Sequence, residues 1–150
     1  MLRITRNRCI VLDNLEDAYD RLNYVNGTII ISTDDADINT VLSGVFALNG
    51  FKCYKTSNAE EAFRIFEDYK DTVDSMVIDG QIAADRSSML IVKVKKKKPQ
   101  VKIVVVSNNQ SIKTGVLEYG ADEFTLKPIS AEMLTNKVLS LFVANRMATQ

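Results

Sequence analysis

The run Thr28–Asp35, Thr-Ile-Ile-Ile-Ser-Thr-Asp-Asp, constrains the fold more than any other stretch of the chain. Its apolar, β-branched first part predicts a strand buried on both faces, as in a parallel sheet covered by helices. It ends in two adjacent carboxylates, which repel each other unless a cation or a basic group lies between them. Because ligands bind at the carboxyl ends of strands in open α/β sheets, we expect this strand to deliver an acidic pair to a site.

The size and composition of the chain predict one domain with a full core. The chain has 150 residues, of which 46% are hydrophobic and 25% are charged, an ordinary balance for a globular protein. Its formal net charge of zero gives no electrostatic argument for nucleic acid or an acidic membrane as a partner. No apolar run approaches the length of a membrane span, and no signal-peptide hydrophobic stretch follows the basic start. We therefore expect a cytoplasmic protein without nucleic-acid or membrane contacts.

The residue types that the chain lacks limit its chemistry. It has no histidine, which excludes histidine metal sites and Ser-His or Cys-His catalysis within the chain. Two cysteines, Cys9 and Cys53, make neither a disulfide framework nor a metal cluster, and we expect both to be reduced packing residues. Any chemistry must therefore use carboxylates, hydroxyls and lysines.

Residues 1–27 do not continue the pattern of the rest and are expected to form an N-terminal extension. Ile10–Leu12 predicts a short strand or an extended arm, and a helical apolar spacing follows Asn14 until Asn26-Gly27 ends it. The apolar positions of that spacing are Leu15, Ala18, Tyr19 and Leu22. Such a helix can cover part of the domain or contact a second copy or another partner, so a homodimer stays open. The domain itself is expected at 28–146, with a short tail at 147–150.

Strand and helix patterns alternate after the first strand. Four more strands are predicted, at Phe51–Lys55, Asp74–Asp79, Val101–Ser107 and Asp122–Leu126. Five helices are predicted: from an Asp37 cap to Leu48, Ala59–Tyr69 after a Ser57 or Asn58 cap, Ser88–Lys98, Gln110–Tyr119 and Ser130–Asn145. Lys95–Lys98 are expected to form the solvated end of the third helix, where positive charge suits the helix dipole. Residues 80–87 are expected to form a loop. Right-handed crossovers then give a flavodoxin-like, doubly wound (βα)5 three-layer sandwich with the parallel sheet order 2-1-3-4-5.

Five polar residues follow the strands of this sheet at one edge. They are Asp34 and Asp35 after strand 1, Asp79 after strand 3, Ser107 after strand 4 and Lys127 after strand 5. Clustered carboxylates without histidine or thiolate favour a hard cation such as Mg²⁺. A further carboxylate can act as a nucleophile toward phosphorus, while a hydroxyl and a lysine hold the phosphoryl oxygens. The alternative is a set of polar strand ends that helix termini and water satisfy.

The same residues resemble the receiver domain of two-component response regulators over about residues 28–145. The matching pieces are Ile-Ile-Ile-Ser-Thr-Asp34-Asp35, Met-Val-Ile-Asp79-Gly, Val-Val-Val-Ser107 and Gly120-Ala-Asp-Glu-Phe-Thr-Leu-Lys127-Pro128. Each piece is weak evidence alone, but the four occur in order and at the expected strand ends. The resemblance implies a signalling switch that accepts a phosphoryl group from a histidine kinase or a phosphotransfer protein and acts on an unknown downstream protein.

The resemblance also implies a role for each site residue. Asp79 is the phosphoacceptor and a Mg²⁺ ligand, Asp35 binds Mg²⁺ directly, and Asp34 helps through water. The backbone carbonyl of Gln81 completes the protein ligands. Ser107 and Lys127 bind the phosphoryl group, and the Lys127-Pro128 peptide bond is expected to be cis.

A switch follows from the same resemblance. Phosphorylation is expected to draw the hydroxyl of Ser107 toward the phosphate and to let Phe124 turn inward; filling a strand-edge site is the alternative role of that ring. The reshaped surface is strand 5 with helices Gln110–Tyr119 and Ser130–Asn145.

Two sequence features depart from the family pattern. The loop after the acceptor has Ile82-Ala83 and Arg86-Ser87 where Met-Pro and Asp-Gly are usual, and Asn108 replaces a small residue. These changes leave a pseudo-receiver, which keeps the fold without phosphorylation, as the first rival hypothesis. A haloacid-dehalogenase-like phosphatase using Asp35-Ala36-Asp37 is the second.

Overall fold

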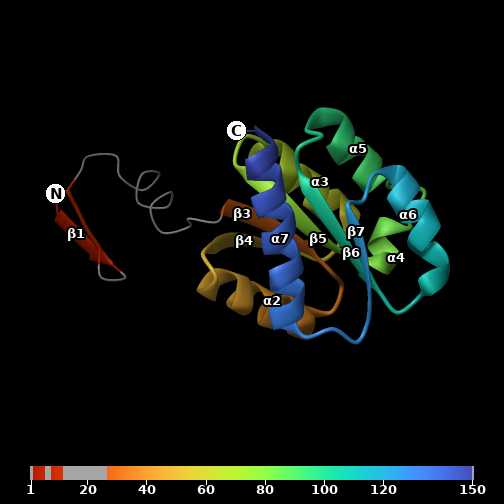
Figure 1. The fold of residues 1–150 in the computed structure, drawn as a ribbon, viewed down its shortest axis with the longest axis horizontal. Helices are drawn as coiled ribbons and strands as arrows, with labels where there is room; N and C mark the ends of the chain where they lie inside the picture. Colours follow the sequence, from red (N-terminus) through yellow and green to blue (C-terminus); the bar gives the residue numbers. More distant parts are fainter. Residues whose placement is uncertain (1, 6–7, 12–26, 150) are drawn as a thin grey trace.

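The computed structural model describes residues 2–5, 8–11 and 27–149 (Figure 1). The strand β1 (Leu2–Thr5) pairs antiparallel with β2 (Arg8–Val11), where the sequence analysis predicted only the second, at Ile10–Leu12. The helix predicted after Asn14 lies outside the described residues. Within those residues, no helix is both long and apolar enough to cross a membrane.

A five-stranded parallel sheet forms the centre of the domain. Its strands are β3 (Gly27–Ser32), β4 (Phe51–Thr56), β5 (Val73–Asp79), β6 (Lys102–Ser107) and β7 (Glu123–Leu126). The order across the sheet is β4-β3-β5-β6-β7, which confirms the predicted order 2-1-3-4-5 and the flavodoxin-like fold class. β3 ends at Ser32 rather than at Asp35, so the acidic pair lies in the loop that follows the strand.

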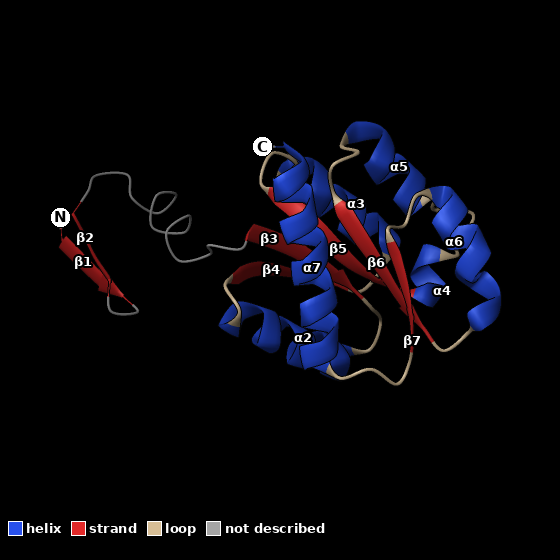
Figure 2. Ribbon diagram, in the orientation of Figure 1, coloured by secondary structure: helices blue, strands red, loops and turns tan. Residues whose placement is uncertain are grey.

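Helices cover both faces of the sheet, as Figure 2 shows. On one face, α2 (Ala36–Leu48) and α7 (Ala131–Thr149) bury residues such as Phe46 and Leu134 against the sheet. The other face is covered by α3 (Ala59–Asp68), α4 (Gly80–Ala83), α5 (Leu90–Lys97), the 3₁₀ turn η1 (Gln110–Ile112) and α6 (Lys113–Tyr119). Both cores consist mainly of β-branched strand residues and apolar side chains from the helices.

Three helix starts differ from the predictions. Asp35, not Asp37, caps α2, because its Oδ1 accepts hydrogen bonds from the backbone N–H groups of Asp37 and Ile38. Residues 80–83, predicted as loop, form the short helix α4. The helix predicted from Ser88 begins at Leu90, because Met89 has a left-handed backbone (φ 49°) that cannot continue a helix.

Two helix predictions on either side of the last strand also need adjustment. The helix predicted from Gln110 starts as η1 and becomes α-helical only at Lys113. The final helix begins after Ser130, as predicted, since the Ser130 Oγ accepts the N–H of Met133. It continues to Thr149, past the predicted end at Asn145.

The lysines at the end of α5 are solvated only in part: Lys96 and Lys97 are exposed, as predicted, while Lys95 and Lys98 are half-buried and hydrogen-bonded. Lys95 donates to the carbonyl of Val101 and to Asp122, and Lys98 donates to the carbonyl of Val73. Lys97 pairs with Glu67. The local sequence does not indicate these bonds, because most of the partners are 25 or more residues away; only the backbone carbonyls of Pro99 and Val101 are near in the sequence.

Asp122 connects α5 to the sheet, and its loss is expected to destabilise the fold. Its Oδ2 accepts from Lys95 Nζ at 2.7 Å and from the N–H of Ile103 at 2.8 Å. Asp122→Ala leaves the N–H of Ile103 without this acceptor and takes the carboxylate away from the partly buried Lys95 ammonium, which keeps the carbonyl of Val101. We therefore expect a loss of about 1–2 kcal/mol in the free energy of unfolding, measured in urea. The exposed Asp71 provides the control, because Asp71→Ala should change that free energy by less than about 0.5 kcal/mol. Equal stability of the two variants would contradict the prediction.

Candidate phosphoacceptor site

Asp79 lies at the carboxyl end of the central strand β5, and both of its carboxylate oxygens accept hydrogen bonds. Oδ1 accepts from the backbone N–H of Gln81 at 3.0 Å, which caps α4. Oδ2 accepts from Lys127 Nζ at 3.0 Å. The Asp79 carboxylate is 14% exposed and the Lys127 side chain 33%, so the pair lies at the surface of the sheet edge, where an incoming group can reach it.

Lys127 reaches Asp79 because the chain turns directly after β7. The N–H of Lys127 donates to the carbonyl of Ser107 at 2.9 Å, which holds the start of the turn against β6. The Lys127-Pro128 peptide bond is cis, as predicted. The sheet therefore brings together two of the predicted site residues that are 48 positions apart in the sequence.

Ser107 lies at the end of β6, the strand between β5 and β7, and packs against Gly80, the residue that follows Asp79. A Cβ atom on Gly80 would lie 2.4 Å from Ser107 Oγ and 2.5 Å from Ser107 Cβ. Only a glycine at position 80 therefore lets the two strand ends approach this closely. The Ser107 Oγ accepts a hydrogen bond from the N–H of Asn109 at 3.0 Å, which ties it to the loop before η1.

The acidic pair lies at the same edge of the sheet, in the loop between β3 and α2. Both side chains are exposed, and Asp35 is the cap of α2. Among the described residues, no group of three or more Asp, Glu, Cys or His side chains is close enough to hold a metal ion. The structure therefore brings Asp79 and Lys127 together, and does not gather Asp34, Asp35 and Asp79 into one set of ligands.

The residue types at this edge still suit Mg²⁺. All the side-chain donors are carboxylate oxygens, and Mg²⁺ needs only one or two of them because it keeps several waters. The Oδ1 of Asp35 is used by the helix cap, but a carboxylate has two oxygens and about four acceptor positions. The donor set therefore fits the ion by its chemistry.

A small hollow of about 30 Å³ lies beside Asp79. Its lining combines Asp79 and Lys127 with the end of β3 and the start of α2, including Ser32, Thr33 and Ile38. The Oγ of Ser32 is buried and has no hydrogen-bond partner. This hollow is too small for a metabolite, so the site suits a group of few atoms.

Phe124 is buried, with 8% of its surface exposed, and packs in the core under α6. The inward turn that the resemblance implies therefore starts from a ring that is already inside. Cys53 is a free thiol, as predicted. Burial raises the pKa of this thiol to about 12, so it is protonated at neutral pH.

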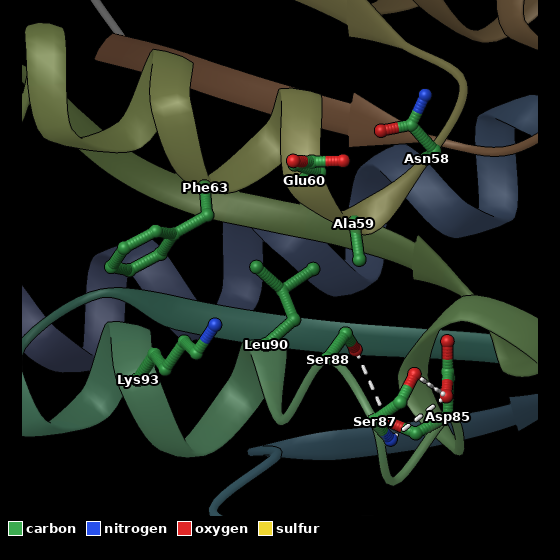
Figure 3. Close-up of a pocket in the computed structure, with 9 residues that line it drawn as sticks. All are labelled: Asn58, Ala59, Glu60, Phe63, Asp85, Ser87, Ser88, Leu90 and Lys93. Carbon is green, nitrogen blue, oxygen red and sulfur yellow. Dashed lines mark hydrogen bonds between the residues drawn. The ribbon is translucent and has the colours of Figure 1, made fainter.

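A larger hollow, of about 450 Å³, lies away from Asp79, between α3 and the loop before α5 (Figure 3). Sequence reasoning did not single out any residue of its lining as functional. On one side, the Oδ1 of Asp85 accepts from the hydroxyl of Ser87 at 2.7 Å and from its N–H at 2.9 Å. These two bonds lower the pKa of Asp85 and close the loop on itself. At the other end, Lys93 lies over the ring of Phe63.

The geometry also bears on the phosphatase hypothesis. Asp35 and Asp37 are the cap and a first-turn residue of the same helix, and the N–H of Asp37 donates to Asp35. Neither side chain is among the described hydrogen-bond or ion-pair partners of Lys127, which pairs with Asp79. The two acids thus serve the start of α2, and the basic group of the site belongs to Asp79.

Comparison with curated proteins finds relatives that are longer than this chain. A cyclic di-GMP phosphodiesterase of Thermotoga maritima is 27% identical over 113 residues, which cover 74% of this chain and 30% of the relative. A DNA-binding transcriptional regulator NtrC of Azospirillum brasilense is 31% identical over 113 residues, which cover 74% of this chain and 23% of the relative. The chain thus spans less than a third of the length of these relatives.

Solved structures share the fold. A receiver domain protein described as CheY-like, from Methanospirillum hungatei, has a TM-score of 0.73 and 21% identity, and the match covers 81% of this chain and 98% of that one. A receiver domain protein from Clostridium thermocellum has a TM-score of 0.71 and 19% identity, with the same coverage. The family model described as the response regulator receiver domain matches residues 29–139. Because that match covers most of the chain, and solved receiver domains share its fold, this chain belongs to the response regulator receiver domain family.

Proposed function

We propose that this receiver is phosphorylated on Asp79 by a histidine kinase or a phosphotransfer protein. The observation that supports the proposal best is the contact of Asp79 Oδ2 with Lys127 Nζ, 3.0 Å apart at the carboxyl edge of the sheet. Ser107 ends the strand between them and packs on Gly80. A carboxylate, an ammonium and a hydroxyl on three neighbouring strands are the groups that an acyl phosphate needs.

The transfer forms one bond to phosphorus and breaks one. A carboxylate oxygen of Asp79 attacks the phosphorus, the bond from phosphorus to the donor's imidazole nitrogen breaks, and that nitrogen keeps the electron pair and takes up a proton from water. The product is an acyl phosphate. Later attack of water on phosphorus restores the carboxylate and releases inorganic phosphate. Lys127 and Ser107 bind the phosphoryl oxygens by charge and hydrogen bond.

Mg²⁺ fits this proposal through a small number of ligands. Asp35 and Asp79 would hold it directly, Asp34 through water, and Gln81 through its backbone carbonyl. When bound, Mg²⁺ supplies positive charge that offsets the charge on the phosphoryl oxygens. The protein's own part is to hold the acceptor carboxylate by the N–H of Gln81 and the ammonium of Lys127.

The response is proposed to pass through Ser107 and the loop that follows it. For its hydroxyl to reach the phosphoryl group, Ser107 must exchange the hydrogen bond from the N–H of Asn109. That loop leads into η1 and α6, which lie beside β7 and Phe124. The surface formed by β7, α6 and α7 then binds a downstream protein in only one of the two forms of the domain, phosphorylated or unphosphorylated.

The proposal is tested by incubating the full chain with acetyl phosphate and following its mass. With Mg²⁺ present we expect a single phosphoryl group on the chain, which hydroxylamine removes because it is an acyl phosphate. Without Mg²⁺, in EDTA, labelling should fall to background. A chain that neither labels nor binds beryllofluoride with Mg²⁺ would instead be a pseudo-receiver.

Lys127→Ala is expected to separate phosphorylation from the response. The variant keeps Asp79, so a fraction of the chains should still be phosphorylated. It lacks the Lys127 ammonium, which pairs with Asp79 and would hold the phosphoryl group there. Hydrogen exchange with and without beryllofluoride and Mg²⁺ should show altered protection in η1, α6 and β7 of the natural chain only. Lys127→Arg, which keeps the charge, is the matched control and should retain part of the change. A full response in Lys127→Ala would exclude the proposed role of this residue.

A further inference from the structure

Thr33 is the residue that the sheet register places next to Asp79 on the side of β3. The strands β3 and β5 are parallel, and the last pair of their register is Ser32 with Ile78. The next step of this register brings Thr33 beside Asp79. The N–H of Thr33 donates to the carbonyl of Thr56 at 3.1 Å, so its backbone still runs beside β4 although β3 ends at Ser32. Neighbouring strands are about 4.8 Å apart, so position 33 adjoins Asp79.

The side chains of Thr33 and Asp79 lie on the same face of the sheet. Successive strand residues point to opposite faces, so Thr33 shares its face with Ile31, and Asp79 shares its face with Val77. Ile31 and Val77 both belong to the core between the sheet and the helices α2 and α7. In agreement with this, all four residues line the hollow of about 30 Å³ beside Lys127. Thr33 is 5% exposed, so its side chain borders this hollow rather than bulk water.

The two acids of the same loop are placed differently from Thr33. Asp34 and Asp35 are exposed, and neither is among the residues that line the hollow. The Oδ1 of Asp35 accepts two N–H groups at the start of α2. The Oγ1 of Thr33 accepts the N–H of Asp35 at 3.2 Å, which ties the loop to the strand end. The chain therefore places an alcohol next to Asp79, and the carboxylates of this loop lie further out.

The charge around Asp79 is already balanced. Among the described residues that line the hollow, Asp79 is the one acid and Lys127 the one base, and the two are 3.0 Å apart. On the side of β6, the register pairs Asp79 with the apolar Val106. The affinity of an oxygen site for a divalent cation rises with the charge of its ligands. The residue at position 33 is therefore well placed to decide how tightly such an ion is held.

We propose that Thr33 sets the Mg²⁺ affinity of the site at Asp79, and that its neutral side chain keeps this affinity low. The inference rests on the proposed function, because it concerns the ion that the phosphoryl transfer would use. An acid at position 33 would add a negative charge directly beside Asp79 and outweigh the charge of Lys127. The hydroxyl adds none, so the natural chain needs a higher Mg²⁺ concentration to fill the site.

Titration of the isotope-labelled full chain with magnesium chloride tests the proposal without a phosphoryl donor. The amide signals of Asp79 and Gln81 give the dissociation constant. Thr33→Asp should bind Mg²⁺ about tenfold more tightly than the natural chain, because it adds a charged oxygen ligand. Thr33→Asn is the matched control, since the amide has the same shape and can still accept the N–H of Asp35. Ala36→Asp adds the same charge at the exposed first residue of α2. Both controls should bind like the natural chain.

Thermal unfolding provides a second readout. Like charges opposite each other on neighbouring strands are destabilising, so in EDTA Thr33→Asp should melt about 3 °C or more below Thr33→Asn. Excess Mg²⁺ should remove most of this difference. If Thr33→Asp does not fold in EDTA, circular dichroism at increasing Mg²⁺ makes the same comparison, and a fold that Mg²⁺ does not restore overturns the proposal.

Two results of the titration contradict the proposal. Equal affinities of Thr33→Asp and Thr33→Asn would show that position 33 does not act on the ion. An equal gain in Thr33→Asp and Ala36→Asp would show that any added acid near this edge has the effect. A natural chain that acetyl phosphate does not label would instead overturn the proposed function, and the Mg²⁺ titration, which uses no phosphoryl donor, would still decide the role of Thr33.

Discussion

Replacing Asp79 with Asn is expected to abolish phosphoryl labelling of the chain while its fold is kept. The amide is not a nucleophile toward phosphorus, so labelling by acetyl phosphate with Mg²⁺ should fall to the background of the assay. An amide oxygen can still accept the N–H of Gln81 that caps α4. Only the ion pair with Lys127 is lost, at a cost of about 1 kcal/mol or less for a pair at the surface. Circular dichroism and urea unfolding check the fold.

The matched control for this variant is Asp85→Asn. Asp85 is an exposed carboxylate six residues further along the same connection, and its hydrogen bonds are to Ser87 rather than to Lys127. It should label like the natural chain. If Asp79→Asn still labels at the normal rate, another carboxylate is the acceptor and the proposed function has the wrong centre. If both variants lose labelling, the loop rather than one carboxylate is required.

Gly80→Ala is expected to damage both stability and labelling. A Cβ at this position would lie 2.4 Å from Ser107 Oγ, 2.5 Å from Ser107 Cβ and 2.8 Å from Ile112 Cδ1. Ser107 cannot simply move away, because it is 5% exposed at the end of β6 and its hydroxyl accepts the N–H of Asn109. The added methyl therefore has to push α4 and the strand end apart. We expect a loss of about 3 kcal/mol in the free energy of unfolding.

The same displacement moves the proposed acceptor, since Gly80 directly follows Asp79. Labelling should therefore fall even under conditions where the variant is fully folded. Gly115→Ala is the control, because its Cβ in α6 would meet nothing within 4 Å and alanine favours a helix by about 0.5–1 kcal/mol. It should be as stable as the natural chain or more so. A normal melting temperature for Gly80→Ala would show that Ser107 and α4 are not packed as described.

The local pattern of the sequence determined the layers and most of the elements. Runs such as residues 101–107 are apolar and β-branched on both faces, and only a strand between two helix layers buries all of them. The predicted cap Ser130 is confirmed, and of the two caps predicted for α3, Ser57 and Asn58, the structure has Asn58; in both cases the side chain accepts an N–H three residues further on. Short connections and right-handed crossovers then predict the strand order 2-1-3-4-5, which is the order observed.

Local reasoning was wrong where a distant partner competes. Asp35 and Asp37 are equally good caps by residue type, and the end of β3 at Ser32 decides which of them starts α2. Lys95 and Lys98 read as surface lysines, but the carbonyls and the carboxylate they bind come from other parts of the chain. Met89 gives no sign in the sequence of the left-handed backbone that delays α5.

The sequence by itself determined that this chain is a doubly wound α/β domain with an acid, a hydroxyl and a lysine at the ends of neighbouring strands, because strand periodicity fixes which residues share an edge. Only the tertiary structure decided that Asp79 and Lys127 are in contact, that Gly80 makes room for Ser107, and that Asp35 serves the start of α2. These are distances between atoms far apart in the chain, and they depend on how the strands and helices pack rather than on any local propensity.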